Sequence, residues 1–175
     1  MKNLTTLLIS IVFIATFGFG QTTYVPDDNF EQALIDLGYD DVLDDYVLTD
    51  SISGVISLDV STKEISDLTG IEAFTALTFL RCENNELTSL DVSANTALTY
   101  LDCGNNQLTS LDMSANTALV NLVCYSNQLT SLDVSNNTAL TNLGCYSNQL
   151  TSLDVSSNTA LSNLECGSNS LTSLN

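Results

Sequence analysis

Cysteine recurs in this chain at a fixed step of 21 residues, and the residues around it recur at the same step. The aligned segments are TALTFLRCENNELTSLDVSAN, TALTYLDCGNNQLTSLDMSAN, TALVNLVCYSNQLTSLDVSNN, TALTNLGCYSNQLTSLDVSSN and the partial TALSNLECGSNSLTSLN. A unit of this size cannot bury its own apolar face, so neighbouring units must stack and share one core. The sequence therefore predicts a solenoid that is stabilised by contacts between neighbouring coils.

The leucines and the cysteine of each unit are predicted to face this core. Alternate side chains of a strand point to the same side, so the cysteine shares a side with the leucine two residues before it. Val60 takes the same place in an earlier unit, which indicates a small buried hydrophobic side chain. Side chains that run parallel on stacked strands approach each other poorly for a disulfide, so we expect free thiols. The inward set of one unit comprises Leu119, Leu122, Cys124, Leu129, Leu132 and Val134.

Asparagine also recurs, at a position where each predicted strand must turn sharply. A side-chain amide there can pair with backbone groups of the turn that would otherwise be buried without partners. We therefore expect a structural role for Asn85, Asn106, Asn127, Asn148 and Asn169.

The N-terminal residues 1–20 are predicted to be a signal peptide. They combine Lys2, an apolar run of about 13 residues, and the small residues Gly18 and Gly20 before a polar segment. The alternative is a membrane-spanning helix, but such a helix needs about 20 apolar residues. We therefore expect a secreted or cell-surface protein with no transmembrane segment.

Residues 21–54 differ from the repeats and are predicted to form an acidic helical cap over the open end of the core. Asp28 and Glu31 have the spacing of a capping box, which predicts a short helix that begins at Asp28 and ends at Gly38. The side of this helix that faces the repeats would carry Phe30, Ala33, Leu34 and Leu37.

Residues 55–175 hold the repeats, as one 22-residue unit, four 21-residue units and one partial unit. The last unit stops part-way. We expect either a fragment of a longer protein or an uncapped C-terminal end that self-associates.

The charge of the chain excludes several classes of function. It has 3 basic and 21 acidic residues, no histidine, and a formal net charge of −18, so nucleic acid binding is not expected. The usual general base and the usual partner of a catalytic cysteine or serine are absent. Glu83 and Asp102 could in principle act as an acid and base pair, but we expect no enzyme activity and no cofactor.

The pattern LxxLxCxxNxL resembles the leucine-rich repeat over residues 55–175, and its short units and the phrase ISDLTGIEAFTAL look like the internalin type. The cap sequence TYVPDDNFEQALIDLGYDDVLDDYVLT joined to LTSLDVSxNTAL units is similar to secreted leucine-rich repeat proteins of the Bacteroidetes. This resemblance implies an α/β solenoid, mostly β, with a parallel sheet on the concave side and irregular or short helical segments outside. It also implies repeats that bind proteins or glycans and are not catalytic.

The strand positions between the inward residues differ most from unit to unit, and they would face outward on the concave sheet. Exposed tyrosines beside small residues favour contact with a protein or a sugar. Two alternatives remain: the rings merely cover the sheet, or the repeats act as a structural spacer in a larger surface protein. The candidate binding residues are Phe79, Arg81, Glu83, Tyr100, Asp102, Tyr125 and Tyr146.

A second column of polar residues repeats in the LDxS part of the units. Neighbouring carboxylates spaced at about 5 Å repel each other by about 1 kcal/mol even in water. Hydrogen bonds from nearby backbone or hydroxyl groups would relieve this, and bound calcium is the alternative. This aspartate column comprises Asp91, Asp112, Asp133 and Asp154.

Overall fold

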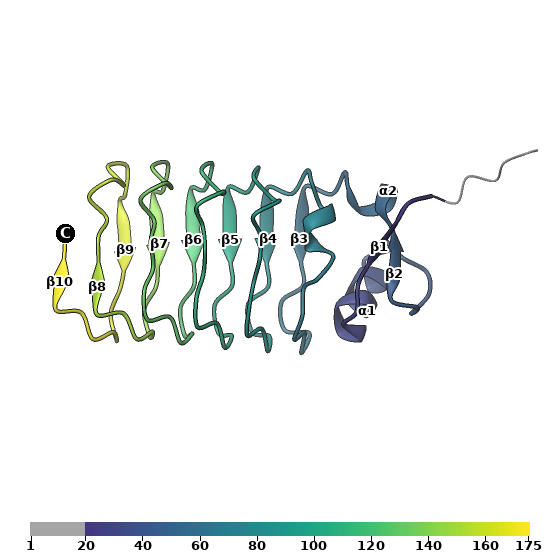
Figure 1. Cartoon of the computed structure of the whole chain (residues 1–175), viewed down its shortest axis with the longest axis horizontal. Coiled ribbons are helices and arrows are strands. Elements are labelled where there is room, and N and C mark those ends of the chain that lie inside the picture. Colours follow the sequence, from purple (N-terminus) through teal and green to yellow (C-terminus); the bar gives the residue numbers. More distant parts are fainter. Residues whose placement is uncertain (1–19) are drawn as a thin grey trace, which may run out of the picture.

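The computed structural model describes residues 20–175, so the predicted signal peptide lies outside the described residues except for its last position. The repeats form a parallel β-solenoid, as predicted, with the cap at one end of the stack (Figure 1). Six strands make up its main sheet in the order β3-β4-β5-β6-β7-β9. They are β3 (Ser57–Asp59), β4 (Phe79–Arg81), β5 (Tyr100–Asp102), β6 (Asn121–Val123), β7 (Asn142–Gly144) and β9 (Asn163–Glu165). We call the outward side of this sheet, which is the predicted concave side, the sheet face.

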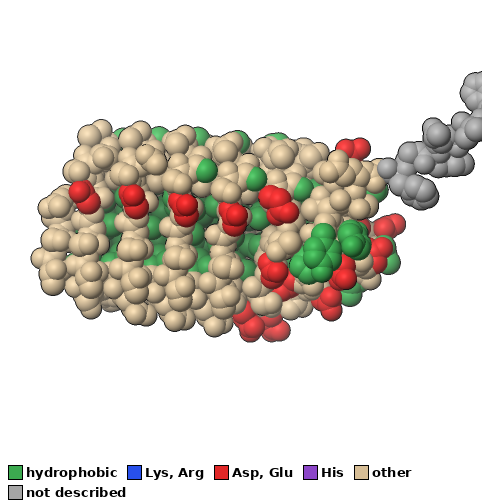
Figure 2. Space-filling model, viewed as in Figure 1, with side chains coloured by type: hydrophobic (Ala, Val, Ile, Leu, Met, Phe, Trp, Pro, Cys, Tyr) green, Lys and Arg blue, Asp and Glu red, His purple; other side chains and the backbone are tan. Residues whose placement is uncertain are grey.

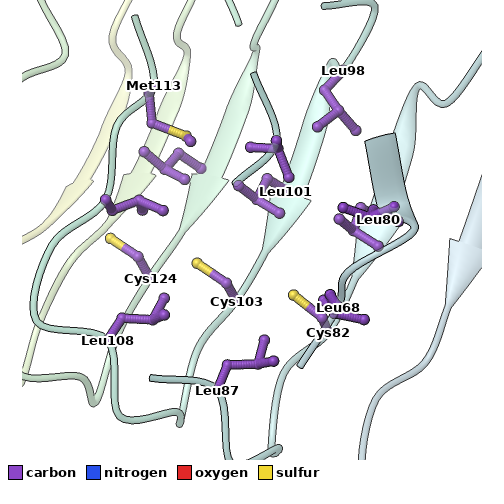
Figure 3. Close-up of a cluster of buried hydrophobic side chains, with 14 of the residues drawn as sticks. Leu68, Leu80, Cys82, Leu87, Leu98, Leu101, Cys103, Leu108, Met113 and Cys124 are labelled. Atoms are coloured by element: carbon purple, nitrogen blue, oxygen red, sulfur yellow. The ribbon is translucent and has the colours of Figure 1, made fainter. Parts of the chain in front are cut away.

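The interior repeats coil by coil. Leu80 and Leu101 pair in register on β4 and β5, and both are fully buried. Figure 3 shows the sulfur atoms of Cys82, Cys103 and Cys124 in a row beside these leucines. The prediction of free thiols is confirmed: four of the five repeat cysteines are buried, and Cys166 is half-buried.

The turn asparagines bind at least four backbone groups each, which confirms their structural role. In Asn127, the side-chain Nδ2 donates to the carbonyl oxygens of Cys103 and Cys124, at 3.1 and 3.2 Å. Its Oδ1 accepts from the backbone nitrogen of Leu108 at 2.9 Å. Because Cys103 and Leu108 belong to the preceding coil, each asparagine ties two coils together.

A second asparagine ladder was not predicted. In Asn137, Nδ2 donates to the carbonyl oxygens of Met113 and Asn116, at 3.0 and 2.9 Å. Its Oδ1 is buried and has no hydrogen-bond partner among the described residues. The equivalent side chains are nearly or fully buried, and they are Asn95, Asn116, Asn137 and Asn158.

The cap contains α1 (Asp28–Asp36), an antiparallel pair of β1 (Thr22–Tyr24) and β2 (Tyr46–Leu48), and α2 (Thr49–Ile52). The predicted capping box is wrong. Asp27, not Asp28, caps α1, and its Oδ1 accepts from the backbone nitrogen of Phe30 at 2.9 Å. Its Oδ2 accepts from the backbone and hydroxyl of Ser66, at 2.9 and 2.7 Å, so bonds to the first repeat favour Asp27 for this role.

Of three further details of the cap, two differ from the prediction and one agrees with it. Glu31 is fully buried and accepts the backbone N–H groups of Asp44, Asp45 and Tyr46 instead of closing a capping box. Leu37, predicted to face the repeats, is 46% exposed because it follows the last residue of the helix. Gly38 ends the helix as predicted, with a φ of 80° that favours glycine.

The LTSL segments across the coil from the main sheet are mostly irregular. In the first repeat one short 3-10 helix, η1 (Ile71–Ala73), follows the equivalent segment ISDL. The last two coils depart from this. Their segments β8 (Ser152–Leu153) and β10 (Ser173–Leu174) pair in parallel and form a small second sheet. This second sheet was not predicted.

Candidate functional site

The sheet face brings the predicted binding residues into neighbouring columns. Phe79 pairs with Tyr100 across β4 and β5, and Arg81 pairs with Asp102 on the same two strands. Glu83 follows Arg81, while Tyr125 and Tyr146 follow β6 and β7 at the phase of Glu83. The parallel in-register sheet therefore converts a repeat position in the sequence into a row on the surface.

The aromatic residues form two stacked pairs. The rings of Phe79 and Tyr100 have centroids 4.4 Å apart and planes 14° apart. The rings of Tyr125 and Tyr146 have centroids 4.9 Å apart and planes 6° apart. All four side chains are half-buried. Stacking on a rigid sheet fixes the ring orientations, which lowers the entropy lost when a partner contacts them.

Gly104 makes room for the tyrosine pair, and the sequence analysis did not identify it as a site residue. A Cβ atom at this position would lie 2.3 Å from Cε1 of Tyr125, so the ring lies directly over the glycine backbone. In successive coils the same repeat position is held by Glu83, Gly104 and Tyr125, so Gly104 lies between the other two. Its small size therefore lets the aromatic pair approach the carboxylates of the neighbouring coils.

A charged cluster adjoins the tyrosines. The Arg81 guanidinium pairs with the carboxylate of Glu83 and, at 3.2 Å, with that of Asp59. Asp59 was not among the predicted site residues; it lies directly across from Arg81 in the sheet register, and the alignment of the repeats could have indicated the pair. Asp102 is 5% exposed and accepts from the backbone nitrogen of Gly104 at 3.1 Å. Two carboxylates thus pair with one guanidinium, and the third carboxyl group, Asp102, acts on it only through its charge.

The acid–base properties of this cluster follow from burial and from its excess of carboxyl groups. Burial, and then the neighbouring Glu83, raise the pKa of Asp102 to about 7. Burial, followed by the charge of Glu83 and Asp102, also raises the pKa of Tyr125. Both shifts show that further negative charge is unfavourable at this point of the sheet face.

The aspartate column lies away from the sheet face, beside shallow furrows between successive coils. Figure 2 shows a row of carboxylates along this side, with hydrophobic side chains visible between the coils. Four furrows have volumes of about 260 to 380 Å³ and are lined mainly by serine, leucine and aspartate. The structure therefore does not bring the aspartate column together with the tyrosines.

Hydrogen bonds are present at every aspartate of this column. The carboxylate of Asp133, for example, accepts from the backbone nitrogen of Ser135 at 2.9 Å. The serine two residues later lowers the pKa of each aspartate through such bonds. Within residues 20–175, no group of three or more His, Cys, Asp or Glu side chains has the arrangement of a metal site.

Across the part of the chain that the structure describes, no helix combines the length and the apolar character needed to cross a membrane.

The repeats match a family model for leucine-rich repeats and one known protein of similar sequence. The family model for leucine-rich repeats in two copies matches residues 75–116. Internalin J of Listeria monocytogenes serotype 4b (strain F2365) is 43% identical over 84 residues, an alignment that covers 46% of this chain and 9% of internalin J. The chain therefore matches only a small part of that relative.

Solved structures extend the likeness over most of the chain. The functional domain of InlJ from Listeria monocytogenes, which includes a cysteine ladder, has a TM-score of 0.82 and 43% identity. That match covers 89% of this chain and 36% of the InlJ chain. The leucine-rich repeat domain of APL1B shares the fold, with a TM-score of 0.60 at 22% identity, over 73% of this chain and 48% of that one. The repeat pattern, the cysteine row and these matches make the chain an internalin-like leucine-rich repeat protein.

Proposed function

We propose that this chain is a secreted or cell-surface adhesion module that recognises a protein or a glycan through its sheet face. The observation that carries the proposal is a contrast between parts of the repeat. The core and turn positions are nearly identical from coil to coil, whereas the sheet face carries two stacked aromatic pairs and a charged cluster. Neither packing nor turn formation requires this variation.

The aromatic pairs are well suited to contact a partner. Aromatic side chains bury a large area at little cost in rotamer freedom, and they dominate the energetics of many interfaces. The rings of Tyr125 and Tyr146 are half-buried and held parallel by stacking, so they are already ordered before a partner arrives. Location outside the cytoplasm is supported by the apolar N-terminal segment of the sequence.

The comparisons support a binding role for the repeats, but they concern only part of the length of the similar proteins. The InlJ match concerns a domain described as functional, and this chain spans 36% of its length. The ligand and the activity of the intact protein are therefore part of the proposal.

The test is a binding screen of the purified chain against a glycan array and a set of cell-surface proteins. The variant Tyr125→Ser, Tyr146→Ser removes the stacked pair from the sheet face. A matched control, Tyr24→Ser, Tyr46→Ser, removes two exposed tyrosines from β1 and β2 of the cap, where the ring centroids are 5.5 Å apart. Both variants are first checked for folding by circular dichroism and thermal melting.

We expect a ligand that the sheet-face variant loses and the cap variant retains. Loss in both variants, or in neither, would contradict recognition through the sheet face. Absence of any ligand for the folded chain would favour the alternative role, a structural spacer in a larger surface protein.

A further inference from the structure

The described surface offers a partner no unpaired positive charge. Within residues 20–175 the basic side chains are Lys63 and Arg81. Lys63 pairs with Asp36, with Nζ and Oδ2 3.2 Å apart, and Arg81 pairs with Asp59 and Glu83. An anionic partner would therefore meet carboxylates without a cation to bind, and approach would be opposed by the net negative charge.

The sheet face, in contrast, has carboxyl groups to spare. Asp59 and Glu83 pair with the single guanidinium of Arg81, and among the described residues Asp102 has no ion pair. The Asp102 carboxyl accepts the N–H group of Gly104 and lies within hydrogen-bonding reach of the carboxyl of Glu83. Its raised pKa follows from burial beside Glu83, which the charge of Arg81 offsets only in part. A cation brought by a partner would supply that balance.

The aromatic pairs favour a polypeptide over a sugar. A sugar ring packs on an aromatic side chain by lying flat against an open ring face. In both pairs the two rings use one face each to stack on one another, and the second face of Tyr125 lies over Gly104. Of the four faces of the tyrosine pair, the outer face of Tyr146 is therefore the one left for a ligand, beside ring edges and hydroxyl groups. These suit the alkyl stems of lysine or arginine and the polar groups of a peptide backbone.

We propose that the partner of the sheet face is a cationic polypeptide segment, with a lysine or arginine seated at Glu83 and Asp102 and neighbouring residues packed against Tyr125 and Tyr146. This inference rests on the proposed function, because it names the class of ligand for the same site. Strands β4 to β7 span about 15 Å at the usual strand spacing, which matches an extended segment of about five residues.

The experiment measures peptide binding to the full chain by fluorescence anisotropy at about 50 mM salt, where surface charges are weakly screened. The probes are a labelled, acetylated and amidated peptide with arginines spaced by glycine and serine, and two peptides with glutamine or glutamate in place of arginine. Labelled chitohexaose serves as a neutral glycan.

The test variant is Glu83→Gln, Asp102→Asn, which keeps side-chain shape and removes the negative charge of both carboxyl groups, of which Asp102 is partly protonated near pH 7. Its matched control is Asp133→Asn, Asp154→Asn, which removes at least as much charge from the aspartate column. Glu83→Gln alone is the second test variant, and melting curves verify that all three fold.

We expect the arginine peptide to bind at least tenfold more tightly than the glutamine peptide, and the glutamate peptide not to bind. The sheet-face variant should weaken arginine-peptide binding at least fivefold, with a smaller loss for Glu83→Gln, and the control variant should change it less than twofold. Equal losses in the test and control variants would show only diffuse attraction to an acidic protein and would overturn the inference. So would failure to bind the arginine peptide.

The two proposals fail in different ways. Suppose that chitohexaose or another neutral ligand binds, that Tyr125→Ser, Tyr146→Ser abolishes this binding, and that Glu83→Gln, Asp102→Asn leaves it intact. That result would retain the proposed function and overturn the proposal of a cationic partner.

Discussion

Replacing Asn127 by alanine should destabilise the solenoid more than the same change at Asn137. Asn127→Ala leaves the buried N–H of Leu108 without its partner. It also removes one of two amide donors to the carbonyl oxygens of Cys103 and Cys124, which keep Asn106 and Asn148. An unsatisfied buried polar group costs about 1 to 3 kcal/mol and a lost hydrogen bond about 0.5 to 1.5 kcal/mol, so we expect a loss of about 2 to 5 kcal/mol in the free energy of unfolding. Asn137→Ala removes two hydrogen bonds, but the carbonyl oxygens of Met113 and Asn116 keep backbone N–H partners. It also removes a buried Oδ1 that has no partner among the described residues, so its expected cost is about 1 to 2 kcal/mol.

Urea unfolding followed by circular dichroism measures both changes, with the slope of the transition used to verify that each variant unfolds in the same manner. Because the two side chains are equal in size and almost equally buried, the loss of packing is nearly the same and cancels in the comparison. An Asn137→Ala variant as unstable as Asn127→Ala, or less stable, would refute the argument from hydrogen-bond partners.

Three further outcomes are expected. Ser147 has a φ of 56°, in the left-handed region, so Ser147→Gly should stabilise the chain by about 0.5 to 1 kcal/mol in urea unfolding. An unchanged or lower stability would contradict backbone strain at this position. The pKa of Asp102 is raised to about 7, so the native state binds its proton more tightly and stability falls as pH rises from about 4 to about 7. Between pH 5 and pH 8 the wild type should therefore lose more stability than Asp102→Asn, and an equal loss would contradict this. Dialysis against a calcium chelator should leave the melting temperature unchanged, since the aspartate column already has hydrogen bonds, and a clear drop would support bound calcium.

Periodicity made the repeat architecture predictable. Leu80, Cys82 and their equivalents recur at one phase, and a side chain that recurs in every coil must face the one environment that every coil shares. The turn asparagines were predictable for the same reason. Asn137 and its equivalents recur just as strictly, but the sequence pattern NTAL gave no sign that their amides reach the carbonyls of the preceding coil.

The cap and the details of the sheet face were less predictable. Asp27 and Asp28 offer the same chemistry at neighbouring positions, and bonds to Ser66, distant in sequence, decide between them. On the sheet face, the register predicted which residues share a column but not how their side chains lean. The stacking of Tyr125 on Tyr146, and its position over Gly104, depend on side-chain rotamers that the repeat pattern does not determine.

The asparagine ladders also make the length of the protein modular. Asn127 and Asn137 form their hydrogen bonds between coils only with the preceding coil. The sequence separation between the bonded residues is the same in every later unit. Deleting residues 117–137 would therefore join Asn116 to Thr138 and let Asn148 bind the backbone groups of Cys103 and Leu108 that Asn127 bound in the preceding coil. The shortened chain should melt cooperatively as a solenoid with one coil fewer, while Tyr146 moves to the place of Tyr125 over Gly104. Gain or loss of whole units can thus rearrange the surface columns in a single step without disturbing the core.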